Sequence, residues 1–307
     1  MNRPAPRSID DYLAQLREAL AGEDPALVQD ALYDAEEYLR AELAASAGKS
    51  EADMLELIAS TYGAPTEVAD AYRETEARVR VALAPPRPRH AAAGPLRRFF
   101  GVFGDVRAWT SLFFLLLTLP TGVFYFTLAV TGLSISLPLL VFIIGVPLFL
   151  AFIGLTRVIA LGEGRLIEAM TGERMPRRPP HPGAPQSLWQ RAFAMLRDLR
   201  TWSTLAYFML SLPIGVAGFV IAVVGLALGL ALPFGALWEG ARLLGLHDAQ
   251  GGIHIGPDEG AWTLLVQWPG IIAMLLAGVL LLTLTLHVAR LGARAIAWLA
   301  KSMLVMR

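Results

Sequence analysis

The sequence predicts an all-α protein, with a small cytoplasmic helical bundle followed by a four-span transmembrane helical domain made of two repeated hairpins. A hydrophobic content of 55% and a mean hydropathy of +0.52 are too apolar for a soluble chain of 307 residues. Charge is also divided unevenly. Residues 1–83 hold 8 Lys and Arg against 17 Asp and Glu, whereas residues 84–307 hold 18 against 9. An acidic head is therefore predicted ahead of a basic membrane part.

The head is predicted to contain four helices, at about residues 8–22, 24–48, 50–63 and 65–83. Capping residues such as Ser8 and Asp24 open them, Pro25 suits a first helical position, and glycines such as Gly63 close them. Apolar residues recur at helical spacing and define the predicted core. They are Ile9, Tyr12, Leu13, Leu16, Leu20, Leu27, Val28, Ala31, Leu32, Ala35, Tyr38, Leu39, Leu43, Met54, Leu55, Ile58, Tyr62, Val68, Ala69, Tyr72 and Val79.

Acidic residues gather on the predicted outer faces of the head. A solvated surface is the ordinary interpretation of such charge runs. However, a head of net charge −9 should be repelled by anionic lipid and left free for a basic protein partner. The predicted partner-binding residues are Asp34, Glu36, Glu37, Glu51 and Asp53.

Two proline-rich basic segments divide the rest of the chain. Residues 84–95 form a linker after the head, which occupies 1–83, and residues 177–187 form a second linker. They separate a first membrane hairpin unit at 96–176 from a second unit at 188–307, which carries an inserted extracytoplasmic loop.

Three charge-free runs supply the four spans. The run between Arg107 and Arg157 has 49 residues, more than twice the roughly 20 that cross a bilayer. A turn signal at 131–138 is expected to split it into spans of about 111–131 and 138–157. Runs of 38 residues after Arg200 and of 30 residues at 260–289 give the third and fourth spans.

Arginine distribution sets the expected orientation. Eight arginines lie between residues 157 and 200, counting both ends, and none lies in the 131–138 turn. Because Lys and Arg mark the cytoplasmic side, both termini are expected to be cytoplasmic, in a multi-pass protein of the bacterial inner membrane. The first hundred residues lack a cleavable signal pattern, so the first span is expected to act as a signal anchor.

An internal repeat appears at an offset of 93 residues. Asp105-Val-Arg-Ala-Trp109 recurs as Asp198-Leu-Arg-Thr-Trp202, and Leu119-Pro120-Thr-Gly122 recurs as Leu212-Pro213-Ile-Gly215. Such matches in one register are best explained by duplication of a two-span unit. The preceding segments, 96–103 and 188–196, mix basic and large apolar residues and are expected to lie as helices in the headgroup layer.

The repeated residues have two interpretations. Trp109 and Trp202 suit the membrane interface, and Pro120 and Pro213 fall about 16 Å further along the helix, near mid-bilayer. Together with Gly122 and Gly215 they form either a paired hinge or small-molecule site, or a packing kink that lets helices approach closely. The Gly225-x-x-x-Gly229 spacing is a helix-contact motif that would also suit a homo-oligomer.

Catalytic chemistry is not indicated. The chain has no cysteine and none of the standard nucleotide, hydrolase or zinc motifs, so no enzyme activity, cofactor or metal is expected. One polar cluster occurs in the predicted outer loop, and it could bind a metal or respond to pH, or be an ordinary solvated loop. Its residues are His247, Asp248, His254, Asp258 and Glu259.

Two family resemblances follow from these motifs. Residues 8–76, above all the Gly63-x-Pro-x-Glu-Val-Ala69 close, resemble the HAAS-type signalling domain of bacterial membrane proteins. Residues 99–300, through the doubled Asp-x-Arg-x-Trp and Leu-Pro-x-Gly units, resemble the multi-span Sensor domain of bacterial signalling proteins. The HAAS resemblance implies a PadR-like transcriptional regulator as partner. Only 17 residues follow Arg290, so no kinase domain is expected.

The expected function is therefore a non-enzymatic membrane sensor. Its spans would sense a lipid, a small molecule or a membrane state, and its head would bind a cytoplasmic regulator, without binding nucleic acid directly. The alternative is a transport or export component, such as a small permease subunit, which the duplication favours and the absence of charge inside the spans disfavours. A structural scaffold is a third possibility.

Overall fold

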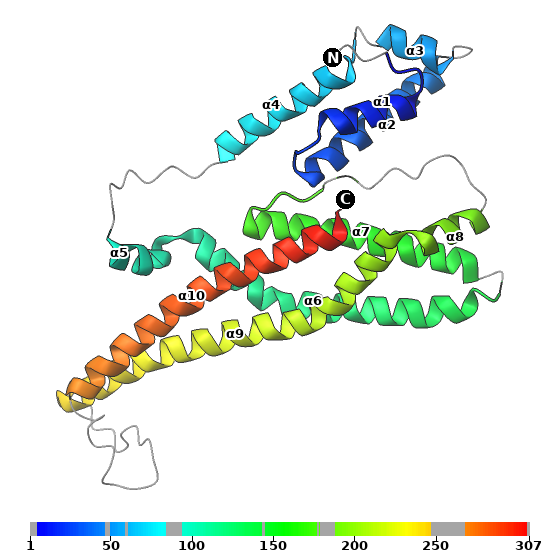
Figure 1. Cartoon of the computed structure of the whole chain (residues 1–307). Helices are drawn as coiled ribbons and strands as arrows, with labels where there is room; N and C mark the ends of the chain where they lie inside the picture. Colours follow the sequence, from blue (N-terminus) through cyan, green and yellow to red (C-terminus); the bar gives the residue numbers. More distant parts are fainter. Residues whose placement is uncertain are drawn as a thin grey trace. The chain divides into compact units, whose positions relative to one another are not determined.

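The computed structural model describes residues 5–46, 50–58, 61–83, 94–142, 145–176, 178, 188–246 and 268–305 (Figure 1). These residues are helical throughout their regular structure, and no strand occurs among them. The predicted all-α class is confirmed. The chain divides into two compact units. One unit comprises Met1–His90, Gly132–Leu205 and Leu299–Arg307, and the other comprises Ala91–Thr131 and Ala206–Trp298.

The head contains four helices, as predicted. They are α1 (Ile9–Ala19), α2 (Pro25–Ala45), α3 (Glu51–Ile58) and α4 (Pro65–Leu83). The Ser8 hydroxyl accepts from the Asp11 amide at 3.1 Å, and Asp24 caps α2 by accepting from the Ala26 amide at 2.9 Å. Gly63, with φ +100°, makes the left-handed turn between α3 and α4.

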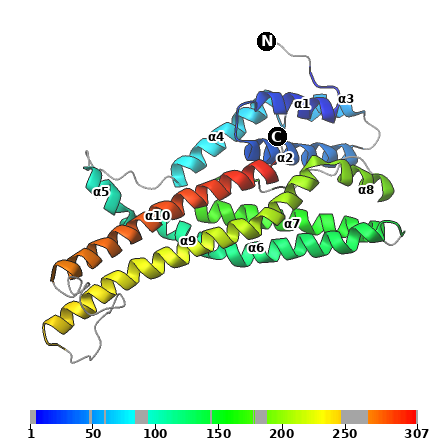
Figure 2. The same ribbon diagram turned by 60° about the horizontal axis from the view of Figure 1, so that its bottom comes forward.

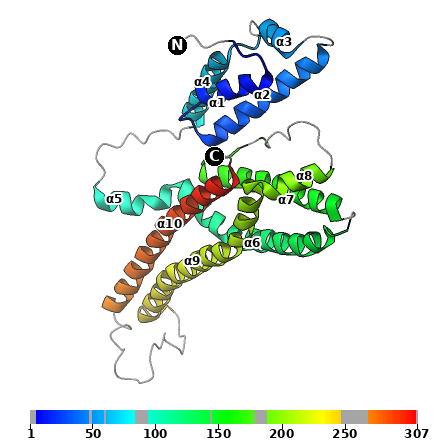
Figure 3. The same cartoon turned by 45° about the vertical axis from the view of Figure 1, so that its right-hand side comes forward.

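Packing in the head centres on α1, which lies against both α2 and α4 (Figure 3). The apolar faces predicted from helical spacing meet in one cluster, whose fully buried members include Leu16, Leu39 and Met54. The Tyr12 hydroxyl, on α1, donates to the Gly63 carbonyl at 2.9 Å. This bond ties α1 to the turn before α4.

Among the described residues, four further helices are long and apolar enough to cross a membrane. They are α6 (Val106–Leu139), α7 (Gly145–Thr171), α9 (Leu199–Leu243) and α10 (Trp268–Leu304). Only 28–33% of the most apolar 18-residue window of each helix is buried inside the protein. The remaining surface is largely apolar, as lipid-facing helices require.

The turn predicted at 131–138 is wrong, because α6 continues through it to Leu139 and α7 begins only at Gly145. The glycine that suggested a turn has a packing role instead. A Cβ placed on Gly132 would lie 1.9 Å from the ring of Phe152 on α7, so the missing side chain makes room for that ring. Turn-forming residues are compatible with helix in a membrane, where backbone hydrogen bonds must be satisfied within the segment.

The second half of the membrane part is built on α9 and α10, which run side by side (Figures 1 and 2). Gly225 and Gly229 both face α10, where an added Cβ would lie 2.4 Å from the Thr285 hydroxyl and 3.1 Å from Leu282 Cβ. The Gly-x-x-x-Gly motif therefore serves a contact within the chain. The homo-oligomer suggested by this motif stays a prediction.

Short helices precede the two repeated motifs, as predicted. Helix α5 (Pro95–Phe100) and the 3-10 turn η1 (Gly101–Gly104) come before α6, and α8 (Leu188–Arg197) comes before α9. Helix α8 carries apolar side chains that the protein leaves exposed, among them Trp189 and Phe193. This pattern suits a helix lying at a membrane surface.

Candidate functional site

The segment after α7 is folded back along that helix. Gly172, with φ +76°, ends α7 in the left-handed conformation, and its amide donates to the Glu168 carbonyl at 2.9 Å. Met175 then packs onto α7 with 1% of its surface exposed, and its Cβ lies 3.3 Å from the position of a Cβ on Gly164. The turn thereby fixes the positions of Arg174, before Met175, and Arg178, after it.

Arg174 holds two acidic residues of the head. Its guanidinium forms an ion pair with Asp30 of α2 at 3.3 Å and a second with Glu76 of α4. The side chains of Arg174 and Asp30 are only 19% and 8% exposed. Since a nearly buried charge is costly without its partner, each residue depends on the other.

Arg178 makes four further contacts with α2. Its side chain pairs with Asp34 at 3.1 Å, its amide donates to Asp30 at 3.1 Å, and its guanidinium lies 5.5 Å from the centre of the Tyr33 ring. Its carbonyl accepts from the Gln29 side chain at 2.7 Å. Together, the ion pair, the backbone hydrogen bonds and the cation–π contact fix one orientation of Arg178 against α2. Attraction between opposite charges alone would not do so.

Lys301, near the end of α10, pairs with Asp24 at 2.6 Å. Asp24 is also the N-cap of α2, where its side chain accepts a hydrogen bond from the Ala26 amide. The same aspartate therefore caps α2 and binds Lys301. We call this set of contacts the head clamp. It consists of Arg174, Arg178 and Lys301 with Asp24, Asp30, Asp34 and Glu76.

The five acidic residues predicted to bind a partner are placed in different surroundings. Asp34 belongs to the head clamp and also accepts from the Tyr72 hydroxyl at 3.1 Å. Burial and the Asp34 charge raise the pKa of Tyr72. Glu36 pairs with Arg40 one turn along α2, at 2.8 Å.

The other three predicted acids lie at the surface. Glu37 is exposed on α2. Glu51, at the start of α3, accepts from the Ile9 amide at 3.0 Å and so caps α1. Asp53 accepts from the Ser50 hydroxyl at 2.7 Å. The charge of the head predicted that its acidic surface would be left free for a partner. Part of that surface is instead bound by basic residues that follow α7 and by Lys301 of α10.

The repeated Leu-Pro-x-Gly motifs meet at a crossing of α6 and α9. A Cβ on Gly122 would lie 2.5 Å from the Ser211 carbonyl oxygen, and a Cβ on Gly215 would lie 2.2 Å from that of Thr118. The Thr118 and Ser211 hydroxyls, also 93 residues apart, each donate across the crossing at 3.4 Å, to Gly215 and Gly122 respectively. The two helices therefore contact each other through equivalent residues.

The prolines and tryptophans of the repeat are exposed. Pro120 and Pro213 are both exposed on the outer faces of their helices. Trp109 and Trp202 are 41% and 44% exposed, and their indole nitrogens donate to the carbonyls of Phe103 and Leu196, six residues earlier in each case. The crossing is formed by close backbone packing at both glycines, and a hinge or small-molecule site at these residues stays a prediction.

Each repeat also begins with a capping aspartate that pairs with an arginine. Asp105 caps α6 and pairs with Arg290 of α10, while Asp198 caps α9 and pairs with Arg157 of α7 at 3.1 Å. His287 lies one turn before Arg290 and its ring nitrogen is 3.1 Å from the Phe99 carbonyl. This histidine anchors α5 to α10.

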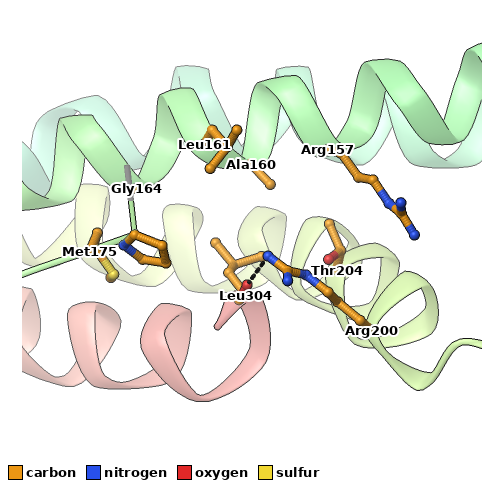
Figure 4. A pocket seen from close by; sticks show the side chains of 9 residues that line it. Arg157, Ala160, Leu161, Gly164, Met175, Arg200, Thr204 and Leu304 are labelled. Carbon is orange, nitrogen blue, oxygen red and sulfur yellow. Dashed lines mark hydrogen bonds between the residues drawn. The ribbon is translucent and has the colours of Figure 1, made fainter. Parts of the chain in front are cut away.

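A pocket lies where α7, the start of α9 and the end of α10 meet (Figure 4). It has a volume of about 20 Å³, enough for one or two water-sized groups. Its walls are formed by Arg157, Ala160, Leu161, Gly164, Met175, Pro176, Arg200, Thr204 and Leu304. We call it the arginine pocket.

Arg200 crosses the arginine pocket from α9 to the end of α10 (Figure 4). Its Nη2 donates to the Leu304 carbonyl at 3.2 Å, which caps α10. Its Nη1 is buried and has no hydrogen-bond partner among the described residues. Ser203, one turn further along α9, donates to the Met303 carbonyl at 2.7 Å and holds the same two helices together.

The outer-loop cluster predicted from the sequence lies outside the described residues. It comprises His247, Asp248, His254, Asp258 and Glu259. Within the described part of the chain, no group of three or more His, Asp or Glu side chains could hold a metal ion. Metal or pH sensing by this loop stays a prediction.

Sequence reasoning missed the head clamp and the arginine pocket. It used the arginines between 157 and 200 only as a topological signal, and it read Asp24 only as a helix cap. The opposite net charges of the two parts of the chain were the available signal, since −9 and +9 in one molecule favour contact between them. The particular pairs depend on the Gly172 turn, whose direction no spacing rule specifies.

Comparison with known proteins identifies the membrane part. The family model described as "Putative sensor" matches residues 114–304, which include every residue of the arginine pocket. No curated protein and no solved structure matches the chain. Because the family match covers well over half of the 307 residues, this protein belongs to the Putative sensor family.

Proposed function

We propose that this protein is a non-enzymatic bacterial membrane sensor whose helical head transmits a signal to a cytoplasmic regulator. The head clamp is the observation that carries the proposal, since it links the acidic head directly to the ends of α7 and α10. The linker at 84–95 alone would transmit orientation poorly. Ion pairs between the head and the span ends supply the coupling that a tether lacks.

The family match and the distribution of arginines support signalling from the membrane helices to the head. Sensor-family helices occupy residues 114–304, and the clamp arginines lie in the arginine-rich segment that is predicted to be cytoplasmic. Both chain termini would then face the cytoplasm of the bacterial inner membrane. The head would be the output, and the membrane helices would be the input.

The mechanism requires two states of the head. In the clamped state, Asp30 and Asp34 are occupied by Arg174 and Arg178. In the released state, these acids join Glu36, Glu37, Glu51 and Asp53 as a surface for a basic partner. A stimulus can shift this equilibrium only if it favours one packing of the membrane helices, and partner binding must then favour the same packing.

A PadR-like transcriptional regulator is the partner class that we propose. The resemblance of residues 8–76 to HAAS-type signalling domains supports it, through the Gly63-x-Pro-x-Glu-Val-Ala69 close. The head itself would not bind nucleic acid, because its net charge is −9.

We further propose that the two hairpins arose by duplication. Equivalent hydrogen bonds at a 93-residue offset support this, namely those made by Thr118 and Ser211 and by Trp109 and Trp202. In a duplicated sensor, a small sliding of α6 against α9 would move both hairpins together.

The test is capture of cytoplasmic proteins by the full chain in mild detergent. The double variant Arg174→Gln with Arg178→Gln should release the head and increase capture of a DNA-binding regulator. Glu36→Gln with Glu37→Gln should reduce it. Arg165→Gln removes an exposed arginine of α7 outside the clamp and should leave capture unchanged. Capture of transport subunits only, or of no regulator by any variant, would reject the signalling role.

A further inference from the structure

We propose that the arginine pocket binds a phosphate group, through Arg157, Arg200 and Thr204. This inference deepens the proposed function by naming the chemistry of a ligand, although the binding itself does not depend on the signalling role. The site is formed by residues of the matched Sensor region and shares no lining residue with the α6–α9 crossing or with the acidic surface of the head.

Charge in the pocket is unbalanced. Arg157 and Arg200 both line the pocket, no acidic residue is among its lining residues, and Asp198 forms an ion pair with Arg157 at 3.1 Å. Asp198 also accepts from the Arg200 backbone amide at 3.0 Å, which uses its second oxygen. One positive charge is therefore left over beside a partly enclosed cavity, and an anion would balance it.

The donors of the pocket are also incompletely used. The Nη2 of Arg200 donates to the Leu304 carbonyl, while its Nη1 is buried and has no hydrogen-bond partner in the described part of the chain. A buried guanidinium nitrogen without a partner is unfavourable, and it costs more than a neutral donor would. The Thr204 side chain, 5% exposed, adds a hydroxyl to the same wall.

Size and donor type favour phosphate. A volume of about 20 Å³ admits one or two oxygen-sized groups rather than a whole ligand, so the bound group must insert terminal oxygens and extend outward. Two guanidinium groups and a hydroxyl match a tetrahedral oxyanion with several acceptor oxygens. The pocket lies beside the start of α9 and the end of α10, where either a lipid headgroup phosphate or a free phosphate could reach it.

The test uses the full chain in nanodiscs and two probes. Inorganic phosphate is titrated into nanodiscs of uncharged glycolipid, and phosphatidic acid is incorporated into otherwise identical nanodiscs. Binding is followed by the shift in the thermal unfolding midpoint, with sulfate and chloride at equal ionic strength as comparisons. The variants are Arg157→Gln and Thr204→Val, which leave the Arg200 cap of α10 intact. Arg197→Gln, on an exposed residue of α8, is the matched control for loss of charge.

We expect one probe to stabilise the wild type and Arg197→Gln, with an affinity at least about tenfold weaker in Arg157→Gln and reduced in Thr204→Val. Stabilisation by inorganic phosphate would identify a free anion as ligand, and stabilisation by phosphatidic acid alone would identify a lipid headgroup. Equal responses of the wild type and both pocket variants to both probes would overturn the site. That result would leave regulator capture by the head untouched, so the two proposals fail separately.

Discussion

Gly122 and Gly215, which lie 93 residues apart, are each packed against the backbone of the helix that carries the other. The nearest atoms to an added Cβ are the carbonyl oxygens of Ser211 and Thr118, at 2.5 and 2.2 Å. Both are backbone atoms and cannot rotate away as a side chain can. The crossing of α6 and α9 therefore depends on the absence of a side chain at two equivalent positions.

Alanine at either glycine should destabilise the protein. Because the helices must move apart to admit the methyl group, Gly122→Ala and Gly215→Ala should each cost about 1–3 kcal/mol. The measurement is the midpoint of thermal unfolding in detergent, followed by circular dichroism. Gly154→Ala is the control, since a Cβ on Gly154 of α7 meets nothing within 4 Å. Equal midpoints for the three variants would contradict this account of the crossing.

The sequence predicted much of this fold because local signals and periodicity were strong. Ser8 and Asp24 cap the helices that they were expected to cap, and the spacing of Leu16 and Leu39 placed both in the head core. The 131–138 turn was wrong because Gly132 has a role in packing against Phe152, which only the partner helix reveals. Contacts far apart in sequence, such as Asp30 with Arg174, have no local signature at all.

Loss of the clamp arginines should release the head. The chain has no cysteine, so spin labels can be attached at Ala44→Cys on α2 and Ala169→Cys on α7, both exposed positions. We expect a narrow distance distribution that becomes broad in Arg174→Gln with Arg178→Gln, because Asp30 then loses its nearly buried partner. Pulsed electron paramagnetic resonance in nanodiscs measures it.

Arg165→Gln serves as the control for that experiment, as it removes one positive charge from α7 outside the clamp. It should leave the distribution narrow. If Arg165→Gln broadens the distribution as much as the clamp variant does, general attraction between the head and a basic surface would explain the contact, and the named ion pairs would not.

The head should lose stability at alkaline pH. Burial raises the pKa of Tyr12, with smaller contributions from Tyr62 and Glu67, and burial and Asp34 raise that of Tyr72. Because the folded state keeps these phenol protons more tightly than the unfolded state, their contribution is complete below the unfolded pKa of about 10. It is lost as pH rises above that value. Tyrosinate absorbance and helicity, measured together from pH 8 to 12, should show these two groups ionising only as helix is lost.

Phenylalanine variants test the assignment of that alkaline transition. Tyr12→Phe and Tyr72→Phe should each make stability less dependent on pH above 10, while losing about 1 kcal/mol at neutral pH with the hydrogen bonds to Gly63 and Asp34. Tyr38→Phe, at the more exposed Tyr38, is the control. An unchanged alkaline profile in both buried variants would assign the transition to other groups.

Phosphate binding and head clamping should be coupled through Met175 and Pro176. These two residues line the arginine pocket and lie between Arg174 and Arg178, which hold the head. An anion in the pocket would fix this wall against α7 and favour the clamped state. The probe that binds wild type should therefore narrow the Ala44–Ala169 spin-label distribution, and it should have no effect on that distance in Arg157→Gln.

Linkage makes the same coupling measurable from the other side. If phosphate favours the clamped head, then Arg174→Gln with Arg178→Gln must weaken phosphate binding, although neither arginine lines the pocket. A coupling of typical size would weaken the affinity by about 5-fold to 150-fold. Arg165→Gln controls for the lost charge and should bind phosphate as the wild type does. Unchanged phosphate affinity in the clamp variant would show that phosphate binding and head clamping are not coupled. If phosphate favours the clamped head, loss of the clamp must weaken phosphate binding.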